Sequence, residues 1–442
     1  MAGGAVIHPQ AKHVVACGIR AAEKSSLYML RHALRRACLL VSVAVAGIRV
    51  AMESCEKEVV INGQRPTWAD IDLDALAANF HQVRCRVAPG VKVMAMVKAN
   101  AYGHGATECG RRLAAEGADW FGVASPEEGI TLRQAGITQP ILCLGGFWDG
   151  QAGACVQYDL VPVVYRLDMI EAFDAAARAS GTVRDVHVKV DTGMGRLGVR
   201  YEAVREFTEK LRSFKNIRVD GVMTHFATAD EEGSASFTSE QITRYREAAN
   251  IFRERGHRPT FEDLANSAGI FAHSASWGNI VRPGGVLYGF WRDVLPTVPD
   301  PPQLHPVMSL RSSITLLKKI NKGETLGYGR TFTASRETLV ATLPIGYHDG
   351  YMRALSNRGR VIVRGSYAPI VGRVSMDLTM VDVTDIEGVT TGDVVTLFGE
   401  GGNLTIPAED VAKEAGTISY ELTCGVSERV PRRFSRGWRT EI

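Results

Sequence analysis

The stretch VKVMAMVKANAYGHG, residues 91–105, decides the fold, because it joins a buried strand to an unusual ending. Its first half is rich in β-branched and apolar residues, which predicts a buried strand. The strand ends at Lys98, although lysine is rarely buried without a partner. Taken alone, such a lysine is usually a solvated strand end. What the other strand ends carry therefore decides how Lys98 is interpreted.

Strand-like segments of this kind alternate with helical segments along the first two thirds of the chain. The eight strand-like segments are VKVMAMVK, WFGVAS, PILCLGG, LVPVVY, VHVKVDTG, VDGVMTHFA, FEDLANS and IVRPGG. Apolar residues at helical spacing predict helices over residues 73–87 and 126–136, among others. Eight alternating β and α units over about 200 residues are typical of a (β/α)8 TIM-type barrel, whose functional residues lie at the C-terminal ends of its strands.

The pattern changes after residue 305. Short β-branched segments follow one another, separated by glycine or charged turns, and only residues 408–416 look helical. This predicts a mainly antiparallel β domain over residues 306–442 behind a barrel over residues 67–305, in the α/β class.

The N-terminal extension, residues 1–66, is basic and differs from the rest. Its apolar run, residues 37–48, is too short to span a bilayer, which takes about 20 residues. If translation starts at Met29, residues 29–46 resemble a signal peptide; the alternative is a disordered or untranslated extension before a start at Met52. We exclude residues 1–65 from the predicted fold and expect a cytoplasmic protein, with export as the alternative.

The amino-acid composition restricts the classes of partner that the protein can bind. The chain has 442 residues, 45% hydrophobic and 22% charged, with a net charge of +3. No basic stripe interleaved with aromatic residues follows the extension, so we expect a small-molecule partner, with no nucleic acid and no membrane. The eight cysteines form no CxxC pair and no zinc-like spacing, which predicts reduced thiols and no metal site.

Polar residues gather at the predicted strand ends. They are Lys98; Lys189, Asp191 and Arg196; His225 and Asp230; Asn266 and Ser267; Arg282, Gly284 and Gly285. Each has a plain structural explanation, such as a hydrogen-bonded histidine or an ordinary Pro-Gly turn. Together they favour a site, because the last two barrel strands are where such barrels bind phosphate.

A phosphate site and a lysine in one barrel mouth point to pyridoxal 5′-phosphate, which binds a lysine amine as an imine. Ser267, Gly284 and Gly285 fit the phosphate. Lys98 would then carry no buried ammonium, which accounts for a lysine at the end of a buried strand.

The chain resembles the alanine racemases over residues 67–440. The matching segments are AMVKANAYGHG, KVDTGMGRLG, THFATAD, ANSAG, VRPGGVLYG, LGYGRTFTA, IGYHDGYMR, GRVSMD and ISYE. The resemblance implies a pyridoxal-phosphate enzyme with an N-terminal barrel and a C-terminal β domain.

The resemblance also implies two catalytic bases. Lys98 would bind the cofactor and serve as the base on the D face, and Tyr328, supplied by the partner subunit of a homodimer, would be the base on the L face. A phenol is a poor base at neutral pH, and a hydrogen bond to His225, which contacts Arg282, would favour the phenolate. Arg282 would also face the pyridine nitrogen and keep it unprotonated.

The remaining site residues follow from the same resemblance. Arg196 and the backbone N–H of Met376, also from the partner, would bind the substrate carboxylate. Lys189 matches a lysine that many members carry as a carbamate. The phosphate would be held by Tyr102, Ser267, Gly284, Gly285 and Tyr420. Tyr420 would also form a wall that favours alanine over larger amino acids.

The chain departs from the family pattern at two places. Gly285 stands where many members have a bulkier aliphatic residue, and the extension before residue 65 has no counterpart. The resemblance implies interconversion of L-alanine and D-alanine, with D-alanine supplied for peptidoglycan. The alternatives are a broader racemase acting on serine, lysine or arginine, a non-catalytic pyridoxal-phosphate-binding barrel, and a barrel decarboxylase.

Overall fold

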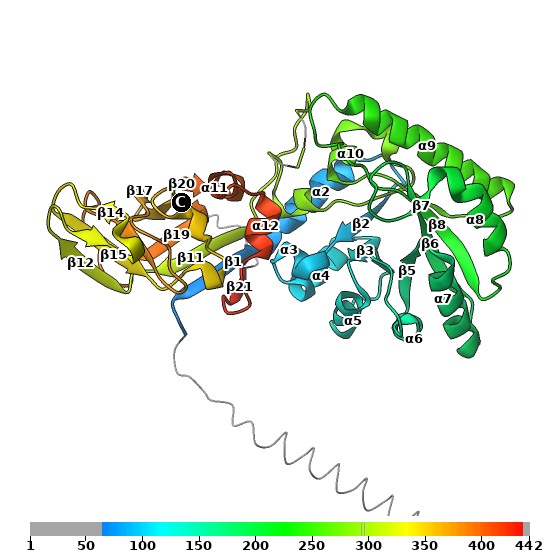
Figure 1. The fold of residues 1–442 in the computed structure, drawn as a ribbon, viewed down its shortest axis with the longest axis horizontal. Helices are drawn as coiled ribbons and strands as arrows, with labels where there is room; N and C mark the ends of the chain where they lie inside the picture. The colour runs from blue at the N-terminus through cyan, green and yellow to red at the C-terminus, as the bar shows by residue number, and fades with distance from the viewer. Residues whose placement is uncertain (1–63, 293, 296, 436–442) are drawn as a thin grey trace, which may run out of the picture. The chain divides into compact units, whose positions relative to one another are not determined.

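The computed structural model describes residues 64–292, 294–295 and 297–435 (Figure 1). The expectations about the apolar run 37–48 and the signal peptide 29–46 lie outside the described residues. In the part of the chain that is described, no helix is both long and apolar enough to cross a bilayer.

Eight parallel strands close into a barrel, as the sequence predicted. They are β2 (Lys92–Met96), β3 (Trp120–Val123), β4 (Ile141–Cys143), β5 (Leu160–Val164), β6 (Arg184–Asp191), β8 (Ile217–Met223), β9 (Phe261–Asp263) and β10 (Ile280–Val281). Their order is β5-β4-β3-β2-β10-β9-β8-β6, and the pairing of β5 with β6 closes the ring. The short strand β7 (Val199–Arg200) pairs with β6 outside this ring.

Helices alternate with the barrel strands along the chain, beginning with α2 before β2, and lie outside them (Figure 1). They are α2 (Leu73–Arg86), α4 (Ala106–Ala115), α5 (Pro126–Gln134), α6 (Ala152–Gln157), α7 (Leu167–Ala179), α8 (Val204–Leu211), α9 (Ala235–Glu254) and α10 (Ser267–Ala272). Helix α2 shows why the spacing was informative: Asp72 caps its first turn, and Leu76, Phe80 and Val83 are buried on one face.

The C-terminal domain is mainly antiparallel, as predicted. Its largest sheet has the order β17-β16-β19-β11-β1-β21, with β20 pairing with β19. These strands are β1 (Thr67–Asp72), β11 (Met308–Ser313), β16 (Arg360–Val363), β17 (Ser366–Pro369), β19 (Val394–Gly401), β20 (Leu404–Ile406) and β21 (Arg432–Ser435). A second sheet consists of β12 (Leu316–Ile320), β15 (Thr338–Leu343) and β18 (Thr379–Asp382), and a third consists of β13 (Thr325–Leu326) and β14 (Phe332–Thr333). The helices are α11 (Ala408–Ala415) and α12 (Ser419–Cys424).

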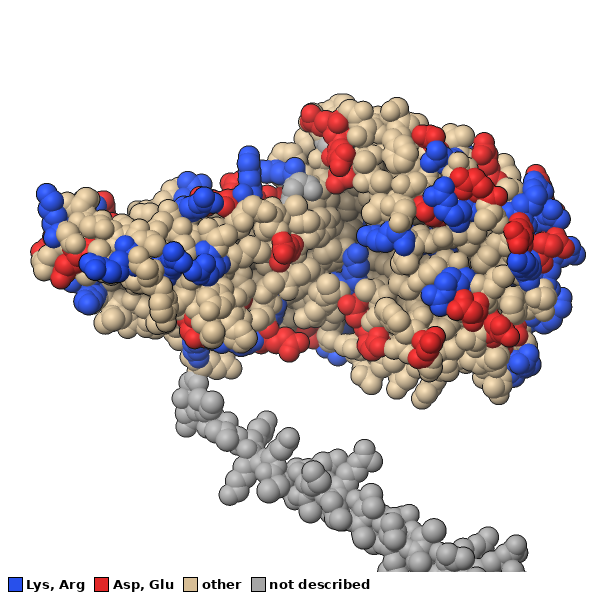
Figure 2. All heavy atoms as spheres, viewed as in Figure 1, with Lys and Arg blue, Asp and Glu red and all other residues tan. Residues whose placement is uncertain are grey.

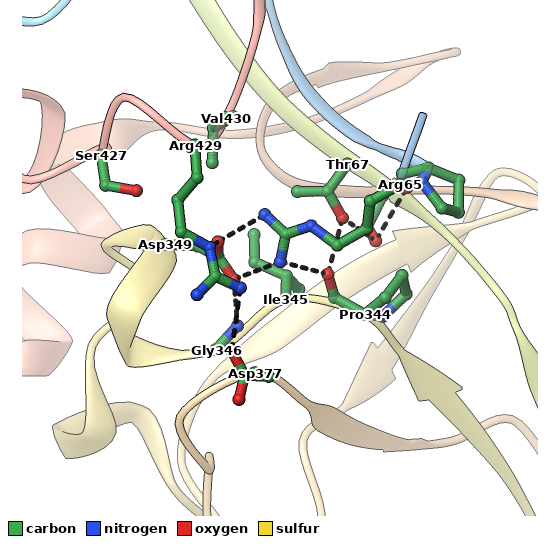
Figure 3. Close-up of polar contacts among 12 residues, drawn as sticks. Arg65, Thr67, Pro344, Ile345, Gly346, Asp349, Asp377, Ser427, Arg429 and Val430 are labelled. Carbon is green, nitrogen blue, oxygen red and sulfur yellow. Dashed lines mark hydrogen bonds and ion pairs between the residues drawn. The ribbon is translucent and has the colours of Figure 1, made fainter. Parts of the chain in front are cut away.

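The start of the folded region differs from the expected boundary. Strand β1 was placed with the barrel, but it lies in the sheet of the C-terminal domain, antiparallel to β11 and parallel to β21. Arg65, which we had left outside the fold, donates hydrogen bonds to the Asp349 carboxylate and the Pro344 carbonyl (Figure 3). Both differences come from pairings with residues more than 200 positions away, which local patterns do not encode.

Replacing Ile71 of β1 tests this placement. Its side chain is fully buried, so Ile71→Ala removes packed methylene groups and leaves a cavity. We expect the free energy of unfolding, measured in urea, to fall by about 2–5 kcal/mol. The matched control is Ile418→Ala, because Ile418 is 51% exposed and its truncation should change stability little. Equal losses for the two variants would contradict the placement of β1 in a core.

Candidate active site

A cavity of about 830 Å³ opens at the C-terminal ends of the barrel strands. Of the twelve predicted site residues, nine line it: Lys98, Tyr102, Lys189, Arg196, His225, Ser267, Arg282, Gly284 and Tyr420. Figure 2 shows a hollow in the visible face with basic side chains beside it, while both signs of charge are mixed elsewhere on that face. The strand ends therefore converge on one site, as the barrel prediction required.

A left-handed turn follows Lys98 and directs Tyr102 into the cavity. In segment α3 (Lys98–Tyr102), four consecutive residues that are not glycine, Ala99 to Tyr102, have φ between 51° and 55°. Such backbone costs roughly 1–2 kcal/mol per residue and persists only where its surroundings enforce it. Here the Ala99 N–H donates to the Glu128 carboxylate at 2.8 Å, and the Asn100 side chain accepts from Ala106 at 2.7 Å.

Helix α12 brings residues from the C-terminal domain to the cavity. Gly103, with φ of 86°, lies so close to the Thr423 carbonyl that a side chain would not fit there. This contact holds α3 against α12, and Tyr420 and Cys424 of α12 line the cavity beside Lys98. The sequence analysis did not single out Cys424 for the site, because a lone cysteine carries no positional signal.

Positive charge dominates the cavity. Burial lowers the pKa of Lys98, and the nearby Arg196 guanidinium lowers it further. Burial, with Arg282 as the next cause, lowers the pKa of Lys189 to about 8. The same two causes hold the pKa of His225 well below its ordinary value, so this histidine is neutral at physiological pH. Deprotonated amines and bound anions are therefore both favoured in this cavity.

The guanidinium of Arg282 lies at the floor of the cavity, ion-paired with Asp263. Both side chains are almost completely buried. Arg282 Nη2 also donates to the Thr224 carbonyl at 2.9 Å and lies 3.3 Å from Nδ1 of His225. The sequence analysis missed Asp263. The segment FEDLANS could have indicated it, because an acidic residue inside a buried strand needs a cationic partner. The neighbouring strand β10 is followed directly by such a residue, Arg282.

Three hydroxyl groups surround the glycines that follow β10. Gly284 N–H donates to the Ser267 hydroxyl at 2.9 Å, and a Cβ at Gly284 would lie 2.7 Å from the Tyr102 hydroxyl. A Cβ at Gly285 would overlap the Tyr420 hydroxyl. Burial raises the pKa of Tyr102, so its hydroxyl stays protonated and able to donate. This donor set fits an anion such as phosphate, and Lys98 in the same cavity fits a cofactor that reacts with an amine.

Gly285, Tyr328 and Met376 are the three predicted residues that do not line the cavity. Gly285 lies beside it, against the Tyr420 hydroxyl, whereas Tyr328 and Met376 lie elsewhere. Both lie on the C-terminal domain, with 74% and 52% of their surface exposed. Tyr328 lies between Gly327 and Gly329, whose positive φ angles of 67° and 72° form a sharp turn. Neither residue lines the cavity. Their contribution to a partner's site stays a prediction.

Comparison with known proteins gives matches over both domains. Residues 71–291 match the family described as alanine racemase, N-terminal domain, and residues 307–434 match alanine racemase, C-terminal domain. The alanine racemase of Geobacter sulfurreducens is 44% identical over 376 residues, which cover 84% of this chain and 97% of that protein.

Solved structures agree with these matches. The alanine racemase of Clostridium difficile 630 has a TM-score of 0.79 at 36% identity, covering 85% of this chain and 97% of that one. The alanine racemase of Bacillus anthracis, solved with bound L-Ala-P, has a TM-score of 0.79 at 34% identity, covering 85% of this chain and 96% of that one.

The electrostatic effect of Arg196 on Lys98 can be measured. Arg196→Gln removes a positive charge that disfavours the ammonium form, so the pKa of Lys98 should rise. We expect modification of Lys98 in the cofactor-free protein by an amine-reactive ester, followed by peptide mass spectrometry, to reach its half-maximal rate at higher pH in the variant. Lys319, whose side chain is 71% exposed, is the internal control. A half-maximal pH that stays the same or falls would contradict this coupling.

Proposed function

The chain belongs to the alanine racemase family, and from this premise we propose that it interconverts L-alanine and D-alanine with pyridoxal 5′-phosphate in the barrel cavity. The observation that carries the proposal is that one cavity holds both a lysine whose pKa is lowered and the hydroxyl groups of Ser267, Tyr102 and Tyr420 beside Gly284. An amine-binding, phosphorylated cofactor needs both.

The cofactor's phosphate would be held by Ser267, Tyr102, Tyr420 and the backbone at Gly284, and its aldehyde carbon by Lys98. When bound, it supplies an electron sink that acidifies the hydrogen on the substrate's α-carbon. Arg282 would meet the ring nitrogen. An arginine does not readily give up a proton, so that nitrogen would stay unprotonated and the sink would be moderate.

Two side chains on opposite faces would move the proton. Lys98 Nζ would take or return the hydrogen on one face, and its lowered pKa favours the neutral amine that this needs. The Tyr328 hydroxyl of a second chain would do the same on the other face. There it would meet His225, which is neutral, and Arg282, whose positive charge would favour the phenolate. A single base would have to cross the plane of the cofactor.

Substrate binding would use the remaining cations. Arg196 and the Met376 N–H of the second chain would bind the carboxylate, and Tyr420 would limit the side chain to the size of alanine. Lys189, with a pKa of about 8, is partly neutral near that pH and can react with carbon dioxide. The resulting carbamate would turn a repelling cation into an anion that steadies Arg196.

The cell context we propose is D-alanine supply for peptidoglycan by a cytoplasmic homodimer. Among the described residues the five cysteines are all free, which suits a reducing compartment.

Assay of the purified protein tests the activity. With pyridoxal phosphate and L-alanine it should form D-alanine, measured by chiral chromatography, and Lys98→Ala should lower kcat by about 10³-fold or more and lose the covalently held cofactor. Lys319→Ala is the surface control. Failure of the wild-type protein to form D-alanine at any pH from neutral to alkaline would refute the proposal. A rate for serine, lysine or arginine equal to that for alanine would favour the broader racemase.

Coexpression of two inactive variants tests the shared site. If Tyr328 acts in the partner's cavity, a heterodimer of Lys98→Ala and Tyr328→Ala chains has one intact cavity and one doubly defective cavity. We expect tandem-tag purified heterodimer to show about half of the wild-type activity, while each variant alone is inactive. An inactive heterodimer would place both bases in one chain.

A further inference from the structure

A buried carboxylate ties the start of the folded chain to its end. Asp349, at the end of the turn η5 (Tyr347–Asp349), is completely buried and ion-paired with two arginines (Figure 3). Arg65 donates to both carboxylate oxygens at 2.5 and 2.8 Å, and Arg429 Nε lies 3.0 Å from Oδ1. The first partner precedes β1 and the second precedes β21, so three distant segments meet at one side chain.

Asp349 also fixes the backbone of its own turn. Its Oδ2 accepts the Gly346 N–H at 2.9 Å. The turn in turn holds a second loop, because the N–H groups of Tyr347 and His348 donate to the carbonyls of Ser375 and Met376 at 3.0 and 3.1 Å. The two backbones approach so closely that a Cβ on Gly346 would overlap these carbonyls. The position of the Met376 loop is therefore set by the turn that Asp349 organises.

Arg429 also contacts the loop that carries Met376. While its Nε faces Asp349, its Nη2 donates to the Asp377 carboxylate at 2.8 Å. The loop closes on itself through the Ser375 N–H, which donates to the Leu378 carbonyl at 3.0 Å. Among the hydrogen bonds of the described residues, none is donated by the Met376 N–H, and Met376 is half exposed. Asp349 and Arg429 thus hold a loop whose Met376 N–H has no hydrogen-bond partner among the described residues.

We propose that Asp349 is a positioning residue, which through Arg429 and the 346–350 turn presents the Met376 N–H to the carboxylate of a substrate in the cavity of a second chain. The inference rests on the proposed function. A carboxylate held by one backbone amide requires that amide at a fixed place, because a displacement of about 1 Å is enough to lose a well-directed contact. The cluster supplies rigidity by charge-assisted hydrogen bonds, while its two arginines and two carboxylates leave it close to neutral.

The test variant is Arg429→Gln, which cuts the bonds to Asp349 and Asp377 and leaves the Arg65–Asp349 pair in place. We expect KM for L-alanine and the inhibition constant of propionate, a carboxylate without the amine, to rise together by about fivefold to tenfold, with kcat within about twofold. Arg429→Lys, which can bond one carboxylate at a time, should give intermediate values. Arg336→Gln breaks an exposed pair with Asp385 in the same domain and is the control.

Asp349→Asn is the stronger variant, because it removes the charge shared by both arginines while keeping an oxygen for Gly346. Its KM should rise at least as far as that of Arg429→Gln; should it fail to fold, Arg429→Gln carries the test alone. A purely structural cluster would instead lower Tm and the active fraction with KM unchanged, and that result would overturn the inference.

Hydrogen exchange separates this inference from the proposed function. The amide hydrogens of Tyr347 and His348 should exchange faster in Arg429→Gln than in the wild-type protein, whether or not the protein has racemase activity. A wild-type protein without racemase activity would refute the proposed function. If the wild-type protein is active, and both the hydrogen exchange and KM are unaltered in Arg429→Gln, the positioning role of Asp349 is refuted while the proposed function stands.

Discussion

The site depends on one constraint: a guanidinium can be buried under the barrel mouth only together with a counter-charge. Asp263 supplies that charge to Arg282, and both side chains are almost completely buried. The pair is close to neutral, so it does not cancel the positive charge of Lys98, Lys189 and Arg196 above it. Burial lowers the pKa of both lysines, the nearby guanidinium groups of Arg196 and Arg282 lower it further, and the positive charge of the cavity attracts anionic groups. The neutral amines and the binding of anions thus both depend on cations that are buried in one cavity.

The barrel and most of the residues at its C-terminal end could be predicted from the sequence, because both produce local sequence patterns. Each buried strand is a short apolar run, and the polar residue that ends it, as Lys98 and His225 do, necessarily faces the common mouth once the ring closes. The partner of β1 was not predictable, since a six-residue strand does not encode which distant strand it will pair with. The left-handed turn after Lys98 was equally hidden, because Ala and Asn residues at 99–101 give no sign of positive φ.

Residues that act at a distance were the hardest to predict. Asp263 and Asp349 are isolated acids in the sequence, and only the folded chain shows that each is buried against arginine. Tyr328 and Met376 are opposite cases: their motifs marked them through the family resemblance, yet the single chain leaves both exposed. Burial therefore identifies the acids that pair with arginine within one chain, whereas the exposure of Tyr328 and Met376 leaves their proposed role to a second chain.

The pairing of strand β1 determines which parts of the chain can fold first during synthesis. Strand β1 is the first strand of the described residues to be synthesised, but its neighbours β11 and β21 are made about 240 and 360 residues later. The eight barrel strands can close in the meantime, whereas the two edges of β1 stay unpaired until β11 and β21 have been made. The C-terminal domain is therefore not an autonomous folding unit: a fragment that began at residue 306 would lack the strand that joins β11 to β21.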